Sequence, residues 1–100
     1  MEYYNFIVGG NSTGKTRKLL EFAKEHDALV VCKNAAAMGR KATAYGITGL
    51  RFCSYDDVAK LIQEGGGLTM DYVIDEVADF MAFFLGLDNG KLIGFTQTED

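Results

Sequence analysis

Cysteines are few in this sequence, and long apolar runs are absent from it. No apolar run approaches the roughly twenty residues that a transmembrane helix needs, so we expect no contact with a membrane. The two cysteines, Cys32 and Cys53, lie in apolar runs of strand length, which favours buried thiols over a disulfide or a metal site. With 48% apolar and 24% charged residues and no low-complexity tract, the chain is expected to form one globular domain, residues 1–100.

Arginine is absent after Arg51, and charge is unevenly divided along the chain. Residues 1–51 contain eight Lys and Arg against four Asp and Glu, whereas residues 52–100 contain two against ten. Ordinary solvated faces are the simplest interpretation of this division. A net charge of −4 does not indicate binding to nucleic acid.

Residues 9–16 fit G-x-x-x-x-G-K-[ST], the pattern of a phosphate-binding loop. The residues of this segment are Gly9, Gly10, Asn11, Ser12, Thr13, Gly14, Lys15 and Thr16. The apolar run 4–8 before it predicts a short buried strand, and the apolar spacing after it predicts a helix over Arg17–His26. Strand, loop and helix therefore follow in the order that such a loop requires.

The chemistry of this pattern is anion binding. Its glycines let backbone N–H groups and the N-terminus of the helix converge on phosphate oxygens. Lys15 would contact the β- and γ-phosphates, the Thr16 hydroxyl would ligate Mg²⁺, and we include Arg17 in the nucleotide-binding segment. The alternative is a glycine-rich turn without a ligand. Because the pattern begins so early, we expect no signal peptide before it and a cytoplasmic protein.

Further apolar runs predict strands at residues 27–32, 50–53, 72–74 and 92–95. Helices are predicted between them: residues 35–44, capped by Asn34; a helix that begins with a capping box of Ser54 and Asp57; and residues 77–87. This alternation predicts an α/β fold, a three-layer αβα sandwich around a five-stranded, mainly parallel sheet with right-handed connections. The continuous run 27–32 suits a central strand buried on both faces.

Two helix faces are also predicted. In the helix after Ser54, an apolar face is expected from Val58, Leu61 and Ile62. The helix at residues 77–87 is apolar almost all round, so it either packs inside the fold or offers Phe83 and Phe84 to a partner. We expect burial, because a small domain uses its aromatic residues in the core.

Asp75 and Glu76 directly follow the strand at 72–74. In parallel sheets ligands bind at the carboxyl ends of the strands, where the loop, this pair and the polar residues Thr96 and Gln97 would all lie. Asp75 looks like a Walker B aspartate, which holds Mg²⁺ opposite the threonine hydroxyl of the loop. Glu76 resembles the catalytic glutamate that orients or deprotonates the attacking water. The alternative for both residues is an ordinary acid at the start of the next helix.

On these motifs the chain resembles the P-loop NTPase superfamily, in its RecA-like branch, over nearly its whole length. The strand spacing is similar to the first half of a helicase core, in which Thr96 and Gln97 would sense the γ-phosphate. It is also similar to the nucleotide-binding core of the thymidine kinase family, in which an aromatic, here Phe80, follows the acidic pair. The resemblance implies a fifth strand between the first and the fourth. Within residues 1–100 we expect no counterpart of the second helicase half or of the zinc-bound lasso of the kinases.

The function expected from this resemblance is Mg²⁺-dependent binding of a nucleoside triphosphate with slow or partner-stimulated hydrolysis. ATP is favoured over GTP because the sequence has no guanine-reading N-K-x-D stretch. Lys15 and Glu76 would be the catalytic residues, Lys15 through charge and Glu76 through the water. Only Arg17, Arg40 or Arg51 could supply a charge-neutralising arginine, so a protein partner or a second copy is expected to complete the site. A non-hydrolysing regulatory module and a kinase-like phosphotransferase remain alternatives.

Overall fold

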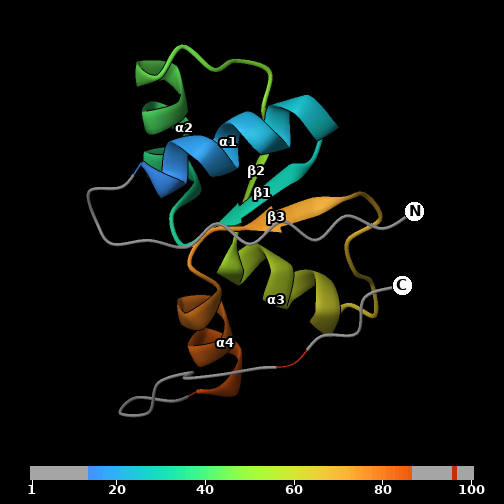
Figure 1. Cartoon of the computed structure of the whole chain (residues 1–100). Helices are drawn as coiled ribbons and strands as arrows, with labels where there is room; N and C mark the ends of the chain where they lie inside the picture. Colours follow the sequence, from blue (N-terminus) through green and yellow to red (C-terminus); the bar gives the residue numbers. More distant parts are fainter. Residues whose placement is uncertain (1–13, 87–95, 97–100) are drawn as a thin grey trace.

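Helices and strands alternate along residues 14–86 and 96, the residues that the computed structural model describes (Figure 1). The elements are α1 (Lys15–His26), β1 (Leu29–Cys32), α2 (Ala35–Ala44), β2 (Phe52–Ser54), α3 (Tyr55–Gln63), β3 (Tyr72–Ile74) and α4 (Val77–Leu85). Each predicted element in this range exists, although α1 begins earlier and α4 ends earlier than the sequence indicated. The predicted strands at 4–8 and 92–95 lie outside the described residues.

The strands form a parallel sheet of order β2-β1-β3. In its register, Val31 of β1 is opposite Cys53 on one side and Ile74 on the other. All four residues of β1 are buried, which confirms the prediction of a central strand covered on both faces. The α/β class and the parallel sheet are therefore confirmed for the described part of the chain, where the sheet has three strands.

Helices cover both faces of this sheet, as Figure 1 shows. One face carries α1 and α2, whose apolar side chains pack on Val30 and Cys32. The other carries α3 and α4, which pack on Leu29 and Val31. From β1 to β2 the chain moves toward one edge of the sheet and crosses on the first face, through α2. From β2 to β3 it moves toward the opposite edge and crosses on the second face, through α3. Because direction and face both reverse, the two crossovers have the same hand.

Cys32 and Cys53 are buried free thiols, as predicted. They belong to different apolar clusters, Cys32 beneath α1 and α2 and Cys53 beneath α3. Burial raises the pKa of Cys32 to about 11 and also raises the pKa of Cys53. Two thiols on opposite faces of a sheet cannot pair, so both act as small apolar core residues.

Side-chain caps begin two of the helices where the sequence places them. The Asn34 side chain accepts a hydrogen bond of 3.0 Å from the Ala37 N–H. At the start of α3, the Ser54 hydroxyl accepts from the Asp57 N–H while the Asp57 carboxylate accepts from the Ser54 N–H, which completes the predicted capping box. These caps place the N-termini of α2 and α3 directly after β1 and β2.

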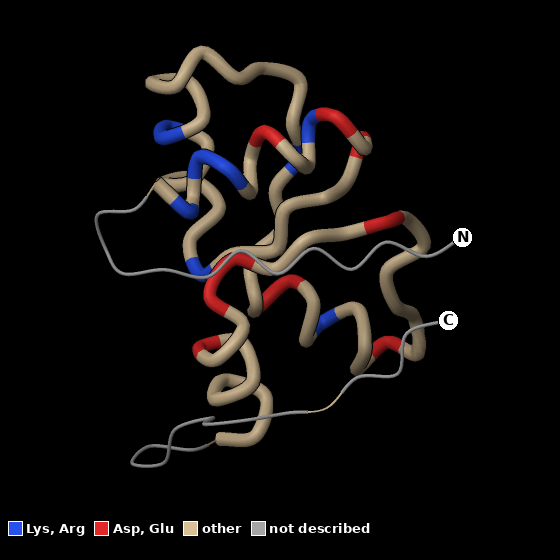
Figure 2. Tube along the Cα trace, in the orientation of Figure 1, with Lys and Arg blue, Asp and Glu red and all other residues tan. Residues whose placement is uncertain are grey.

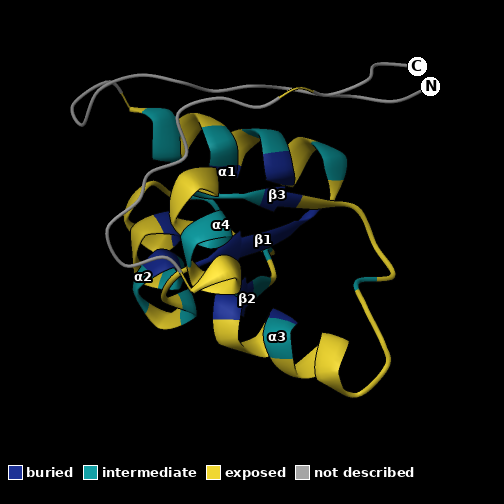
Figure 3. Ribbon diagram, turned by 90° about the horizontal axis from the view of Figure 1, so that it is seen from below, coloured by how far each residue is buried: buried dark blue, intermediate teal, exposed yellow. Residues whose placement is uncertain are grey.

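Two predictions about helix faces are wrong. In α3 only the first turn reaches the sheet, so Val58 is buried whereas Leu61 and Ile62 are 37% and 54% exposed. In α4 no residue is buried, and Phe83 and Phe84 are 44% and 36% exposed. The two helices contact each other through aromatic rings near their first turns, whereas their last turns are exposed, as the colouring in Figure 3 shows.

Charge is divided between the two helical layers, as Figure 2 shows. The basic layer, α1 and α2, has six cationic side chains, Lys15, Arg17, Lys18, Lys24, Arg40 and Lys41, against Glu21 and Glu25. In the acidic layer, α3 and α4, Lys60 is opposed by Asp56, Asp57 and Asp79. None of the helices in the described part of the chain has the length and apolar character needed to cross a membrane.

Candidate functional site

The candidate site lies at the carboxyl ends of β1 and β3. After β1 the chain continues into α2 on one face of the sheet, whereas after β3 it continues into α4 on the other face. Neighbouring parallel strands whose following helices diverge in this way form a topological switch point, where ligands bind in open α/β sheets. The start of α1 reaches the same edge, because Lys15 contacts the residue that precedes α4.

Gly14 precedes α1 in the left-handed conformation, with φ 74° and ψ 22°. Glycine adopts this conformation without the steric cost of a Cβ atom. Lys15 is the first residue of the helix, so Thr16 and Arg17 lie in its first turn with backbone N–H groups that the helix itself does not use. This is the junction of glycine and helix that the sequence pattern requires.

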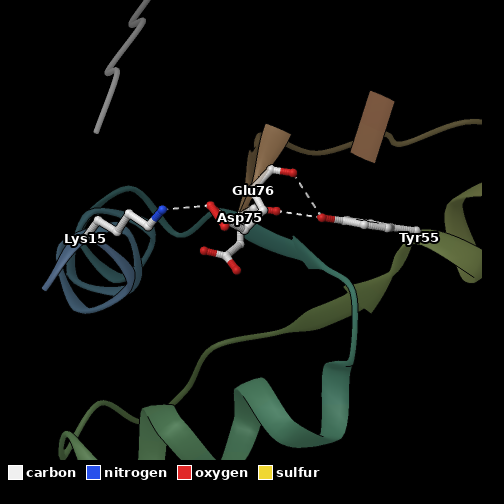
Figure 4. A network of polar contacts seen from close by, with 4 residues as sticks. All are labelled: Lys15, Tyr55, Asp75 and Glu76. Atoms are coloured by element: carbon white, nitrogen blue, oxygen red, sulfur yellow. Dashed lines mark hydrogen bonds and ion pairs between the residues drawn. The ribbon is translucent and has the colours of Figure 1, made fainter. Parts of the chain in front are cut away.

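Lys15 and Glu76, predicted from separate motifs, are in direct contact. The Lys15 Nζ atom donates to Glu76 Oε1 at 2.9 Å, as Figure 4 shows. This hydrogen bond is the main reason why the pKa of Lys15 is raised. The side chains are 25% and 47% exposed, so water competes for both charges and the pair contributes little to stability.

Asp75 extends the sheet by one hydrogen bond, from its N–H to the Val31 carbonyl at 2.9 Å. Partial burial of the carboxyl group raises its pKa, the neighbouring Glu76 raises it further, and Lys41 and Lys15 oppose the shift. A carboxylate that has lost part of its hydration gains from a nearby cation. The Asp75 carboxyl group is therefore partly desolvated and has both acidic and cationic neighbours.

Magnesium is the ion that the sequence pattern implies, with Thr16 and Asp75 as ligands. Within the described residues, no group of three or more His, Cys, Asp and Glu could hold a metal ion alone. Mg²⁺ in nucleotide sites does not need such a group, since phosphates and water supply most of its ligands and one or two protein oxygens suffice. Asp75 and Thr16 carry a carboxylate and a hydroxyl, which are oxygen donors of the kind that Mg²⁺ takes.

Glu76 has a left-handed backbone, with φ 60° and ψ 69°, directly before α4. For a residue with a Cβ atom this conformation costs about 1–2 kcal/mol. The single O–H of Tyr55 is shared between two successive carbonyl oxygens of this turn, that of Asp75 at 2.7 Å and that of Glu76 at 3.2 Å (Figure 4). Tyr55 was not among the predicted site residues, and the available signal was its position after the cap Ser54, at the end of a strand.

Two of the candidate arginines are engaged elsewhere. Arg51 donates to the Asp27 carbonyl at 3.0 Å and lies 3.3 Å from the Asp27 carboxylate, next to the residues that begin β1 and β2. It is therefore at the amino edge of the sheet, opposite Lys15. Arg17 pairs with Glu21 at 3.4 Å and lies over the Tyr45 ring. Neither arginine has an observed contact with Lys15 or with the acidic pair.

Some of the predicted site residues are not among those that the structure describes. Residues Gly9–Thr13 of the loop and Gln97 are not among the described residues. Thr96 is described as exposed and outside any helix or strand. The residues that the structure brings together are thus Lys15, Asp75 and Glu76, with Thr16 in the same helical turn as Lys15.

Comparisons of the chain with protein-family models, with curated proteins and with solved structures give no match.

Proposed function

We propose that this chain is a minimal P-loop NTPase domain that binds a Mg²⁺-nucleoside triphosphate, ATP in preference to GTP, and hydrolyses it slowly or on stimulation by a partner. The observation that carries the proposal is the 2.9 Å contact between Lys15 and Glu76. One residue comes from the phosphate-loop pattern and the other from the acidic pair after β3. Their meeting is what a nucleotide site built from the two motifs requires.

The start of α1 favours an anion. Backbone N–H groups of its first turn are free of helical partners, the helix dipole is positive there, and Lys15 adds a full charge. The anion present in this structure is the Glu76 carboxylate. Because that carboxylate is about half exposed, a phosphate group with more negative charge can take its place without first opening a buried core.

The fold needed for such a site extends beyond the described strands. We propose that residues 4–8 and 92–95 add two strands beside β3 and complete a five-stranded sheet of the P-loop type. Within the described residues β3 pairs on one side, with β1, and no strand is described on its other side. A strand at 4–8 in this sheet would deliver Gly9–Gly14 to the carboxyl edge, directly before α1.

The proposed reaction is in-line attack of water on the γ-phosphorus, which breaks its bond to the β–γ bridging oxygen and releases nucleoside diphosphate and phosphate. Lys15 would bind phosphate oxygens and stabilise the charge that develops on them. The phosphate would replace the Glu76 carboxylate at Lys15, and the released Glu76 would orient the water and accept its proton. A magnesium ion held by Thr16 and Asp75 would neutralise part of the phosphate charge. The chain's own residues thus cover binding, charge stabilisation and water activation.

A partner, or a second copy of the chain, is part of the proposal. Arg17 and Arg51 have contacts away from the acidic pair, and no contact joins Arg40 of α2 to that pair within the described residues, so a further cation for the γ-phosphate is expected from another surface. The same observation favours one alternative, a nucleotide-binding module that does not hydrolyse and whose bound state controls a partner.

The test is calorimetric binding of Mg·ATP to the parent chain and to Lys15→Ala, with Lys18→Ala as control. Lys18 lies on the same helix, and its substitution removes the same charge. We expect Lys15→Ala to weaken binding at least about tenfold, or about 1.4 kcal/mol, without unfolding the domain. Equal affinities of parent and Lys15→Ala would show that the loop is a structural turn. Phosphate release from bound ATP then separates an NTPase from a non-hydrolysing module.

A further inference from the structure

Tyr55 is a buried tyrosine whose hydroxyl reaches the candidate site. It is the first residue of α3 and is 3% exposed. Its ring packs edge-on against Phe80 at 5.3 Å and lies 5.8 Å from Phe83. The packing holds the ring between α3 and α4, so the hydroxyl has a fixed direction, and Figure 4 shows it pointing at the Asp75–Glu76 turn.

The Asp75–Glu76 turn, which accepts the hydrogen bond from this hydroxyl, has a strained backbone. Glu76 has a positive φ of 60°, a conformation that residues with a Cβ atom rarely adopt. Non-glycine residues keep such a conformation only where surrounding contacts hold it, and they cluster at functional sites. Here the contacts are the two hydrogen bonds from Tyr55 to the backbone and the ion pair from Lys15 to the side chain.

We propose that Tyr55 is a positioning residue, which holds the Asp75–Glu76 turn in its left-handed conformation so that Glu76 projects toward Lys15 and Asp75 stays at the end of β3. For its catalytic consequence this inference rests on the proposed function. The claim that Tyr55 holds the turn is independent of the proposed function, because the turn, the hydroxyl and the ion pair are present without a ligand.

The hydroxyl, and not the ring, carries this role. The ring fills the space between α3 and α4, a task that phenylalanine performs equally well. One hydroxyl shared between two successive carbonyls fixes their relative orientation, and this sets φ and ψ at Glu76. Without the hydroxyl, the turn can relax toward a negative φ, which rotates the Glu76 side chain away from Lys15.

The test compares Tyr55→Phe with Tyr72→Phe. Tyr72 lies in β3, in the strand that leads into the same turn, and is 53% exposed, so its substitution removes a hydroxyl without changing the turn. In Tyr55→Phe we expect the ¹³Cα and ¹³Cβ chemical shifts of Glu76, which report its backbone conformation, to move toward those of a negative φ. Faster hydrogen exchange at the Asp75 N–H, which is bonded to Val31 in the parent, is also expected. Unchanged shifts and exchange would overturn the proposal.

Kinetics then separate positioning from a loss of stability. Glu76 acts on the water in the transition state, so we expect kcat for Mg·ATP to fall about tenfold or more in Tyr55→Phe while the nucleotide Kd changes less than about threefold. Equal kcat in Tyr55→Phe and in the parent would contradict the catalytic part of the proposal. If the parent binds no nucleotide, the proposed function fails, and the chemical shifts and hydrogen exchange still decide whether Tyr55 holds the turn.

Discussion

Lys15 and Glu76, 61 residues apart in the chain, form an ion pair of 2.9 Å between Nζ and Oε1. Under the proposed function this contact joins the two residues that the reaction uses for different purposes. A phosphate that binds Lys15 competes with the Glu76 carboxylate for the same ammonium group. Nucleotide binding is therefore expected to release Glu76 at the moment when an attacking water needs it.

The first prediction follows from this competition. Glu76→Gln keeps the size of the side chain and removes its charge, so Lys15 becomes free for phosphate. We expect Mg·ATP affinity equal to that of the parent or slightly higher, and hydrolysis slower by roughly 10² or more, because an amide cannot accept the proton of the water. Calorimetry gives the affinity, and single-turnover phosphate release gives the rate.

Asp75→Asn is the matched comparison for this prediction, since it makes the same chemical change one residue earlier. We expect it to weaken binding in the presence of Mg²⁺ far more than in its absence, because Asp75 is the proposed metal ligand. If Glu76→Gln and Asp75→Asn reduced Mg²⁺-dependent affinity to the same extent, Glu76 would belong with the metal and could not be the group that orients water.

Local sequence signals predicted much of the described fold. The Asn34 cap and the reciprocal Ser54–Asp57 capping box depend on residues within three positions of each other, and both are present. The central strand was predictable because a buried parallel strand requires an unbroken apolar run, and β1 supplies one. The shared location of Lys15 and Glu76 was predictable too, because the carboxyl ends of parallel strands lie at one edge.

Features that depend on how elements pack were not predictable. The apolar spacing of Leu61 and Ile62 is correct for a buried helix face, but it cannot show that only the first turn of α3 reaches the sheet. The burial expected of Phe83 fails for the same reason, because apolar character almost all round a helix does not show which neighbours cover it, and no residue of α4 is buried. The role of Tyr55 depends on a hydrogen bond across 20 residues of chain, to Asp75, and on a positive φ that no residue type in the sequence signals.

A second prediction concerns alkaline pH. Burial raises the pKa of the Cys32 thiol from 9.0 to about 11, so between these values the unfolded chain releases this proton and the folded chain keeps it. The contribution of the neutral thiol to stability is therefore full below pH 9 and is lost as the pH rises toward 11. The difference between a pKa of 9.0 and one of about 11 corresponds to at most about 3 kcal/mol of unfolding free energy. Urea unfolding between pH 8 and pH 11, at about unit steps, should show a smaller decline in Cys32→Ala than in the parent. Identical declines would show that other groups cause it.

A third prediction concerns the end of α1. Asp27 has a left-handed backbone, with φ 52° and ψ 45°, and its carboxylate, 3.3 Å from Arg51, belongs to a side chain that is 91% exposed. Asp27→Gly and Asp27→Ala both remove this weak ion pair and differ in the Cβ atom alone. We expect the glycine variant to exceed the alanine variant in unfolding free energy by about 1 kcal/mol, measured by urea unfolding. An alanine variant of equal or higher stability would mean that the turn relaxes to a negative φ.

The last prediction concerns the surface of α4. Phe83 and Phe84 are exposed side chains on the helix that begins at the acidic pair, and the candidate arginines Arg17 and Arg51 are engaged elsewhere. A site with its γ-phosphate open to water and without a neutralising arginine is a poor setting for electrostatic catalysis. A second protein surface anchored on this helix would supply both the cover and the cation.

Hydrolysis per chain should therefore rise with protein concentration, or on addition of a partner, and Phe84→Ser should reduce that rise. Ile62→Ser is the control, because Ile62 is also an exposed apolar residue, 54% exposed. It lies near the last residue of α3, at the opposite end of that helix from Tyr55, which faces the site. Phosphate release measured over a range of chain concentrations, together with sedimentation of the same samples, relates rate to assembly. Turnover that is independent of concentration, at rates typical of partnered NTPases and from a strict monomer, would show that the chain completes its own site. In that case one of the three candidates, Arg17, Arg40 or Arg51, would supply the neutralising charge when nucleotide binds.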